Sequence, residues 1–193
     1  MAVWKGCDVR HIGTQRIETN RLVLRRFALD DAQAMYENWA SDGEVTRFLT
    51  WPAHQNVDVS KAVLEDWVAR YRDDSFYQWA IAPKELGDEP IGSISVVKLD
   101  DGIDMAHIGY CIGRRWWHQG IVSEALRAVM DFLFVEVGAN RVEAYHDTNN
   151  PRSGSVMRRC GMSYEGTMRA AARNNQGICD ICCYAALRAD RQV

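Results

Sequence analysis

The clearest chemical signal in this sequence lies in residues 109–130, which read GYCIGRRWWHQGIVSEALRAVM. We expect a strand to end near Ile112 and a helix to begin near Gly120, with a short loop between them. The start of a helix carries unpaired backbone N–H groups and the positive end of the helix dipole. Gly120 lets the backbone approach an anion closely, and Ser123 can donate a hydroxyl. The junction therefore predicts a site for a phosphate group.

This loop differs from the two best-known phosphate-binding motifs. It has neither the G-x-x-x-x-G-K-[ST] of a P-loop nor the G-x-G-x-x-G of a dinucleotide fold, and the P-loop lysine is missing. Arg114 and Arg115 can add positive charge at its rim. Many junctions of this kind contain one glycine and bind nothing, so a purely structural role for this loop is the alternative that the residues alone leave.

The cysteines need a separate test for metal binding. The chain has six cysteines, and Cys179 and Cys182 have the spacing of half a zinc site, but no second pair with ligand spacing follows. Residues 178–187 are expected to form a strand, on which positions i and i+3 face opposite sides of the sheet. We therefore expect small buried hydrophobic residues and no metal. A metal- or redox-active cysteine protein is the alternative.

The composition limits the class of protein. The chain has 193 residues, 26 of them acidic and 23 basic, with a net charge of -3. This length fits one domain, and the slight acidity argues against a nucleic-acid binder. No apolar run approaches the roughly 20 residues of a membrane span. Residues 1–20 contain no run long enough for a secretory signal, so a reducing cytoplasm is the expected location.

Hydrophobic patterning predicts one domain over residues 19–190, after a loosely held lead-in over residues 1–18. The segment 21–27 alternates apolar and basic residues, as a half-exposed strand does. The order is a strand, two helices, three strands, a helix, a strand, a helix and two strands, which indicates an α/β fold with a mixed sheet and helices on its faces. We expect strands at 21–27, 76–84, 90–99, 104–113, 141–146 and on both sides of RNNQG (173–177), and helices at about 30–39, 59–72, 120–137 and 150–160.

Two sequence blocks match a known family. Residues 109–134, GYCIGRRWWHQGIVSEALRAVMDFLF, resemble the acetyl-coenzyme A loop and helix of the GNAT superfamily of N-acetyltransferases. Residues 147–162, DTNNPRSGSVMRRCGM, resemble the D-x-x-N-x-x-S-x-x-V helix that follows in that family, with its terminal glycine. IETNRLVLRRFALDDA, EVTRFL and FYQWAI are similar to the RimJ/RimL branch, whose named members acetylate N-termini of ribosomal proteins. The resemblance covers about residues 17–188. The matching positions of the second block are Asp147, Asn150, Ser153, Val156 and Gly161.

The resemblance implies a mostly antiparallel sheet with one parallel strand pair that splays apart and holds the pantetheine arm of the cofactor. The backbone of Cys111 and Ile112 would bind that arm, with Tyr110 adjacent. Trp117 and Val122 depart from the usual loop pattern, and Val122 could crowd the anion. Simple packing is the alternative role for Trp117. The diphosphate would lie on the amides of Trp117, His118, Gln119, Gly120, Ile121 and Val122 and on the hydroxyl of Ser123.

The same resemblance suggests the residues that move protons. Asn150 would bind a pantetheine amide, and Ser153 would lie near the sulfur. Many family members have a tyrosine acid where this chain has Met157, so Ser153 is the substitute donor. A glutamate base found in this branch is replaced by Ala172, and His107, where relatives often carry glutamate, is the candidate base. Helix capping by Asn150 and Ser153, and a structural role for His107, are the alternatives.

The acceptor would be a primary amine, either a protein N-terminus or a small molecule. The cleft should be framed by the first two helices, their connection FLTWPAH (48–54) and the hairpin around RNNQG. Trp51 and Trp79 could line it, although aromatic residues in such segments are often core. We expect direct acetyl transfer in a ternary complex, with acetyl-coenzyme A as co-substrate and no metal. A non-catalytic acyl-coenzyme A sensor with the same fold is the alternative. The sequence leaves the oligomeric state open, a homodimer included.

Overall fold

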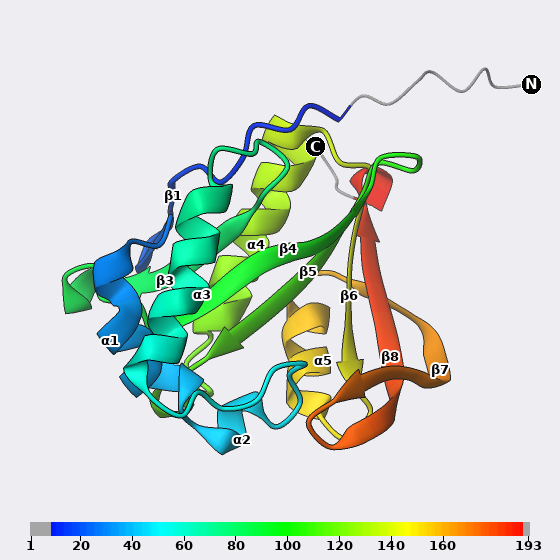
Figure 1. Ribbon diagram of the computed structural model, residues 1–193. Coiled ribbons are helices and arrows are strands. Elements are labelled where there is room, and N and C mark those ends of the chain that lie inside the picture. Colours follow the sequence, from blue (N-terminus) through cyan, green and yellow to red (C-terminus); the bar gives the residue numbers. More distant parts are fainter. Residues whose placement is uncertain (1–8, 191–193) are drawn as a thin grey trace, which may run out of the picture.

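The computed structural model describes residues 9–190, which form a single eight-stranded sheet with helices on both faces (Figure 1). The strand order is β1-β2-β3-β4-β5-β6-β8-β7. Strands β5 and β6 run parallel, and every other neighbouring pair is antiparallel. The strands are β1 Ile17–Glu18, β2 Leu22–Arg25, β3 Gln78–Pro83, β4 Gly92–Asp100, β5 Met105–Ile112, β6 Arg141–Asp147, β7 Ser163–Asn174 and β8 Gly177–Leu187.

The helices follow the predicted order, and two of them end in a wider π-helical turn. The helices are α1 Ala32–Met35, continued by the turn Tyr36–Ala40; α2 Gly43–Thr46; α3 Val57–Arg70; α4 Ile121–Phe132, continued by the turn Leu133–Val137; and α5 Pro151–Arg159. Gly138, which adopts a left-handed conformation, ends the α4 segment as expected. Short 3-10 turns occupy Leu29–Asp31, Lys84–Leu86, Arg114–Trp116 and Arg188–Asp190.

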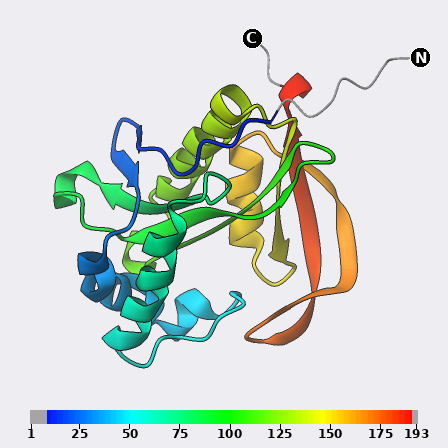
Figure 2. The same ribbon diagram turned by 45° about the horizontal axis from the view of Figure 1, so that its top comes forward.

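Two apolar cores lie on opposite faces of the sheet. Figures 1 and 2 show α4 and α5 on one face and α1, α2 and α3 on the other. The larger core packs α4 and α5 against the central strands, and the smaller packs α1 and α3 against the opposite face. The apolar stripe predicted for α4 is confirmed, because its side chains are buried: Leu126, Val129, Met130, Leu133 and Val137.

The parallel pair separates part of the way along its length. The pairing of β5 with β6 begins at Met105 and Arg141 and ends at His107 and Glu143. Strand β5 continues to Ile112 and β6 to Asp147 without further pairing between them, while β6 stays paired with β8 along its whole length. A gap therefore opens between the two strands beyond His107, as the expected splayed pair requires.

The N-terminal segment differs from the expected lead-in. Residues 9–18 are held to the sheet: the amide of Gly13 donates to Asp74, and buried Thr14 bonds the backbone of Phe76 and Gln78. The segment ends in the short strand β1. The prediction of a loose segment is therefore wrong for residues 9–18, and residues 1–8 lie outside the described part of the chain. Strand β2 is also buried rather than half-exposed.

In the described part of the chain, no helix combines the length and the apolar character that crossing a membrane requires.

Candidate active site

The loop before α4 forms a set of unpaired backbone donors. A 3-10 turn at Arg114–Trp116 follows β5, and His118 and Gly120 adopt φ of +65° and +73°. Across residues 9–190, no protein acceptor bonds the amide N–H groups of His118 and of residues 120–123, whereas the amide of Glu124 bonds the carbonyl of Gly120. Left-handed residues next to a helix start turn successive amides toward a common point. The loop therefore has the donors that an anion needs.

Positive charge and a buried hydroxyl lie beside these amides. Gly120 and Ser123 line a depression of about 430 Å³ together with Arg21, Arg127 and Arg159. Ser123 is only 5% exposed. Arg114, expected at the rim, is instead ion-paired with Asp42 at 3.0 Å. Glu124 also lines the depression and is paired with Arg21. The depression can therefore accept an anion bound by amides and flanked by the guanidinium groups of Arg127 and Arg159.

The backbone that faces the gap belongs to Tyr110 and Ile112. The amide of Gly113 bonds Ile91 in β4, and backbone groups alternate sides along a strand, so the groups of Cys111 also face β4, opposite Ser93. The expectation that Cys111 offers its backbone to a ligand in the gap is therefore wrong. Its thiol contacts the Ser93 hydroxyl at 3.4 Å, and burial raises its pKa.

The two residues that depart from the family loop pattern both pack against the core. Val122 and Trp117 lie against the larger apolar cluster, so the branched side chain of Val122 is directed into the protein. The indole of Trp117 donates to the carbonyl of Ile112 at 3.0 Å, and Arg152 of α5 lies over its ring. Trp117 therefore fastens the end of β5 to the loop, and the polar backbone of Tyr110 remains directed at the gap.

Ser153 faces the gap from α5. Its Oγ lies 2.9 Å from the hydroxyl of Tyr110, which reaches across from β5. Asn150 occupies the N-cap position of α5, but its side chain makes no capping bond, and Pro151 begins the helix. Met157 is 1% exposed and belongs to the core. Ser153 and Tyr110 are thus the hydroxyl groups that α5 and β5 bring together here.

His107 lies where the parallel strands begin to separate. Its Nδ1 is 3.1 Å from Oε1 of Glu143, its register partner, and the edge of the Tyr145 ring is close. Burial lowers the pKa of His107, and the hydrogen bond to Glu143 opposes that effect. Burial alone would raise the pKa of Glu143, but hydrogen bonds from His107 and Arg141 outweigh it and lower that pKa. The carboxylate of Glu143 thus orients the imidazole of His107, an arrangement suited to accepting a proton.

The base and the acid candidates lie on opposite faces of the sheet. Alternation along β5 places Tyr110 with the core under α4 and α5, and His107 on the other face. Ser153 comes from α5 and shares the face of Tyr110.

The two tryptophans expected at the acceptor cleft differ in their surroundings. Trp79 is fully buried, stacks on Tyr77 and donates to the carbonyl of Gln15 at 2.6 Å, so the expectation that it contacts an acceptor is wrong. Trp51 is half-buried, packs beside His54 and lies in the connection before α3. Trp51 lies next to the turn between β7 and β8, because the side chain of Asn175 in that turn donates to the Trp51 carbonyl.

One asparagine joins the two segments expected to frame the acceptor. The side chain of Asn175, in the turn between β7 and β8, donates to the carbonyls of Thr46 and Trp51 at 2.8 and 2.7 Å. The backbone amide of Asn175 donates to the carbonyl of Leu49 at 3.1 Å. Figure 2 shows the connection before α3 extending toward this turn. The two segments therefore form a continuous bridge beside the gap.

The surroundings of five cysteines are described by the structure. Five of them, Cys111, Cys160, Cys179, Cys182 and Cys183, are free and half-buried rather than fully buried, and Cys7 lies outside the described residues. Cys179 and Cys182 both lie on β8 as expected. Among residues 9–190, no group of three or more His, Cys, Asp or Glu side chains could hold a metal ion.

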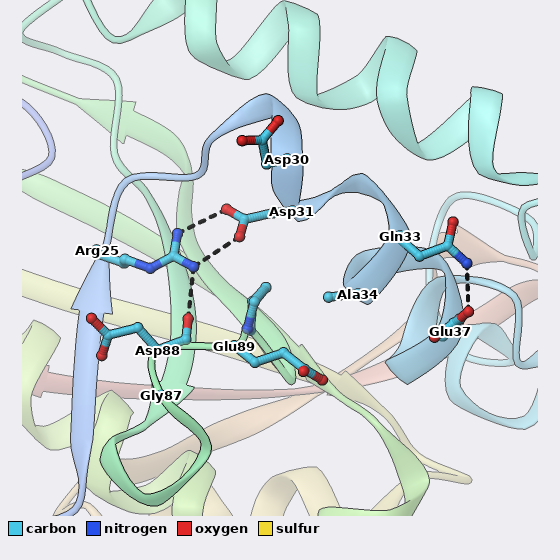
Figure 3. Close-up of a pocket in the computed structure, with 10 residues that line it drawn as sticks. Arg25, Asp30, Asp31, Gln33, Ala34, Glu37, Gly87, Asp88 and Glu89 are labelled. Atoms are coloured by element: carbon cyan, nitrogen blue, oxygen red, sulfur yellow. Dashed lines mark hydrogen bonds and ion pairs between the residues drawn. The ribbon is translucent and has the colours of Figure 1, made fainter.

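A second depression, of about 420 Å³, lies between α1 and the connection of β3 to β4 (Figure 3). Its walls carry acidic side chains, among them Asp30, Glu37 and Glu89. Asp31 is neutralised by two 2.8 Å hydrogen bonds from Arg25, which also bonds the carbonyl of Asp88. Its lining contains no residue of α4, α5 or β6, so it is separate from the site at the strand gap.

Four contributors to the site were not predicted: Arg21, Glu124, Glu143 and Asn175. The sequence gives no register between distant strands, so the contact of Glu143 with His107 could not be read from it. Asn175 lies within RNNQG, and a turn of three consecutive amide side chains is the one signal that could have singled it out.

The comparisons with known proteins agree with this geometry. A family model described as the acetyltransferase (GNAT) domain matches residues 21–163. The N-acetyltransferase p20 of Bacillus licheniformis is 27% identical over 174 residues, which are 90% of this chain and 97% of that relative. The [ribosomal protein uS5]-alanine N-acetyltransferase of Escherichia coli is 28% identical over 159 residues, 78% of this chain and 79% of the relative.

Solved structures share the fold. RimL, the ribosomal L7/L12 alpha-N-protein acetyltransferase in complex with coenzyme A, superposes with a TM-score of 0.79 at 21% identity, over 90% of this chain and 98% of that one. At this identity the likeness concerns the fold. With the family match over residues 21–163, the chain belongs to the GNAT superfamily of N-acetyltransferases, in its RimJ/RimL-type branch.

Proposed function

We propose that this enzyme transfers the acetyl group of acetyl-coenzyme A to a primary amine, by direct attack of the amine in a ternary complex. One observation carries the proposal: a loop with five unpaired amides follows β5, the strand that has separated from its parallel neighbour β6. The amides of His118 and of residues 120–123 suit a diphosphate, and the space between the strands suits an extended arm that bonds the backbone of Tyr110. Bound there, acetyl-coenzyme A supplies a thioester that a neutral amine can attack.

His107 accepts the proton of the amine. An amine is mostly protonated at neutral pH and cannot attack until it loses a proton. The imidazole of His107, oriented by Glu143, takes that proton through a water molecule. A new C–N bond then forms as the C–S bond breaks, and the electron pair of the broken bond leaves on sulfur. The nitrogen of the new amide loses its second proton, which restores the proton that Ser153 gives to the sulfur.

Ser153 donates a proton to the departing sulfur. Its hydroxyl lies 2.9 Å from that of Tyr110, which can hydrogen-bond the serine oxygen while Ser153 supplies a proton on one face of the sheet and His107 accepts one on the other. Asn150, free of capping, binds an amide of the pantetheine arm. The buried Cys111 thiol, with its raised pKa, is a poor nucleophile, which supports transfer without an acetyl-enzyme.

The acceptor class we favour is the N-terminal amine of a protein or peptide. The relative from Escherichia coli is named for acetylating an alanine of ribosomal protein uS5. In this proposal a short N-terminus beginning with a small residue approaches along Trp51 and the hairpin that Asn175 fastens. A small-molecule amine is the other acceptor class.

An acceptor screen tests this proposal. Labelled acetyl-coenzyme A is mixed with the protein and with peptides beginning with Ser or Ala, amine antibiotics or polyamines, while free thiol is followed. We expect thiol release that depends on an acceptor, a labelled product, and no acetylated protein by mass spectrometry. Tight coenzyme A binding without transfer to any of these amines would indicate an acyl-coenzyme A sensor instead.

A further inference from the structure

An ion pair joins the start of β2 to the first turn of α4, beside the unpaired amides. The guanidinium of Arg21 and the carboxylate of Glu124 are 2.7 Å apart, and the amide of Arg21 also bonds Glu124 at 3.0 Å. Thr19 donates to the same carboxylate at 2.6 Å. Burial alone would raise the pKa of Glu124, but these hydrogen bonds lower it. The carboxylate is thus charged and fixed.

Arg21 also holds the peptide unit that contains the Gly120 amide. Its Nη1 donates to the carbonyl of Gln119 at 3.1 Å. In a trans peptide the C=O of one residue and the N–H of the next point in opposite directions. Directing the Gln119 carbonyl at Arg21 therefore directs the N–H of Gly120 away from Arg21, into the set of unpaired donors.

This peptide unit needs such a restraint. Gly120 lacks a Cβ and has φ of +73°, so the peptide before it can rotate at low cost. A rotated peptide would present the carbonyl of Gln119 to the anion and withdraw the Gly120 amide. One donor would be replaced by a repelling acceptor.

Glu124 is an unexpected residue next to an anion site. A carboxylate in the first turn of α4 favours the helix itself, but it repels a diphosphate bound at the same helix end. The repulsion between Glu124 and a bound diphosphate is explained if the contact between Glu124 and Arg21 is needed to shape the loop. Arg21 is half-exposed, and Glu124 is only about one-fifth exposed, so the carboxylate is the anchored partner.

We infer that Arg21 and Glu124 are positioning residues for the cofactor: together they lock the Gln119–Gly120 peptide in the orientation that binds the diphosphate. The inference rests on the proposed function only for the identity of the ligand. The proposed role of Arg21 differs from that of the arginines that act on the anion by charge, because the Arg21 side chain is already bonded to Glu124 and to the carbonyl of Gln119.

Coenzyme A titrations by calorimetry test this assignment, because the two possible roles of Glu124 predict opposite changes in coenzyme A affinity. Glu124→Gln removes a negative charge, so a purely electrostatic role predicts tighter coenzyme A binding. Peptide locking predicts weaker binding, by about tenfold or more, the effect of losing a charged hydrogen bond. Arg21→Lys keeps the charge but loses the planar fork, and should also weaken binding by about tenfold.

Matched controls come from the exposed pair Arg16 and Glu18 on the same edge of the sheet. Arg16→Lys and Glu18→Gln should leave coenzyme A affinity within about twofold of the wild type, since surface pairs contribute little. For Arg21→Lys and Glu124→Gln, the KM for acetyl-coenzyme A should rise while kcat is kept. Thermal unfolding monitors the fold.

The outcomes are distinguishable. Glu124→Gln that binds coenzyme A as tightly as the wild type, or more tightly, overturns the locking role. If either variant unfolds early, the coenzyme A titration is repeated well below its unfolding temperature, and unchanged affinity there overturns the inference. Wild-type protein that binds coenzyme A but transfers no acetyl group counts against the proposed function alone. Wild-type protein that does not bind coenzyme A overturns both.

Discussion

The hydroxyl oxygens of Tyr110 and Ser153 lie 2.9 Å apart, which links β5 to α5 across one face of the strand gap. Tyr110 is also 3.2 Å from the backbone carbonyl of Ser153. Burial raises the pKa of Tyr110, so its phenol keeps its proton and remains a donor. When Ser153 gives up its proton, Tyr110 can stabilise the oxygen that is left.

Replacing Ser153 therefore tests the acid. We predict that Ser153→Ala lowers kcat by about 10²-fold, within the range typical of losing a general acid. Coenzyme A affinity should change little, because the diphosphate is bound elsewhere. Steady-state kinetics and calorimetry measure the two effects. Unchanged turnover would remove Ser153 from the mechanism.

Tyr110→Phe should also lower kcat, but by less, about tenfold, because Ser153 remains while its partner is lost. Tyr164→Phe is the matched control, since its hydroxyl bonds Thr167 on the exposed strand β7. A Tyr110→Phe enzyme as fast as this control would show that the tyrosine only packs.

The pH dependence of kcat/KM tests His107. The pKa of His107 lies below its ordinary value of 6.5 because of burial, with Lys98 lowering it further and Glu143 raising it. A base acts when neutral, so the rate should rise with pH through a midpoint below 6.5. His107→Gln should abolish this rise, and a profile identical to that of the wild type would exclude His107.

Glu143→Gln gives the second arm of this test. Removing the carboxylate removes the contribution that raises the pKa of His107, so the midpoint should move to lower pH. Glu165→Gln is the control, since Glu165 bonds Arg141 and not His107. A midpoint that moves upward in Glu143→Gln would contradict the pairing.

The order of elements could be predicted from the sequence because each element carries its own period. The stripe of α4 is a repeat of 3.6 residues, and the three central strands are separated by clear turns. Local geometry could also be predicted at two positions of the family pattern: Gly120 directly precedes α4, and Asn150 directly precedes α5, while their ligand-binding roles stay predictions. These features are local, and local patterning is what a single sequence records.

The errors concern long-range geometry. Trp79 looks like a cleft aromatic, but its partners Tyr77 and Phe132 bury it on the opposite side from the acceptor segments. Cys111 was assigned to the gap although the register of β4 with β5 turns its backbone the other way. Arg21 and Glu124 are 103 residues apart in the chain, so their ion pair depends on the tertiary fold alone.

Gly113 is predicted to be essential for the stability of the loop. A Cβ there would lie 2.1 Å from the carbonyl of Asn38 and 2.7 Å from the ring of Trp116. Gly113→Ala should therefore cost about 1–3 kcal/mol of unfolding free energy and weaken coenzyme A binding. Gly43→Ala is the control: it lies in helix α2 with open space around it, and should be neutral or slightly stabilising. Urea denaturation compares them, and equal stability would contradict the clash.

Asn175 is predicted to control acceptor binding without affecting the cofactor. Asn175→Ala removes two side-chain hydrogen bonds to the connection before α3, so the segments beside Trp51 can move apart. We expect the KM for a peptide acceptor to rise by about five- to tenfold, the effect of one or two hydrogen bonds, while the KM for acetyl-coenzyme A stays constant. Gln176→Ala, whose exposed side chain is the next along the turn, is the control. An acceptor KM that matches this control would show that the bridge is structural and that the acceptor enters elsewhere.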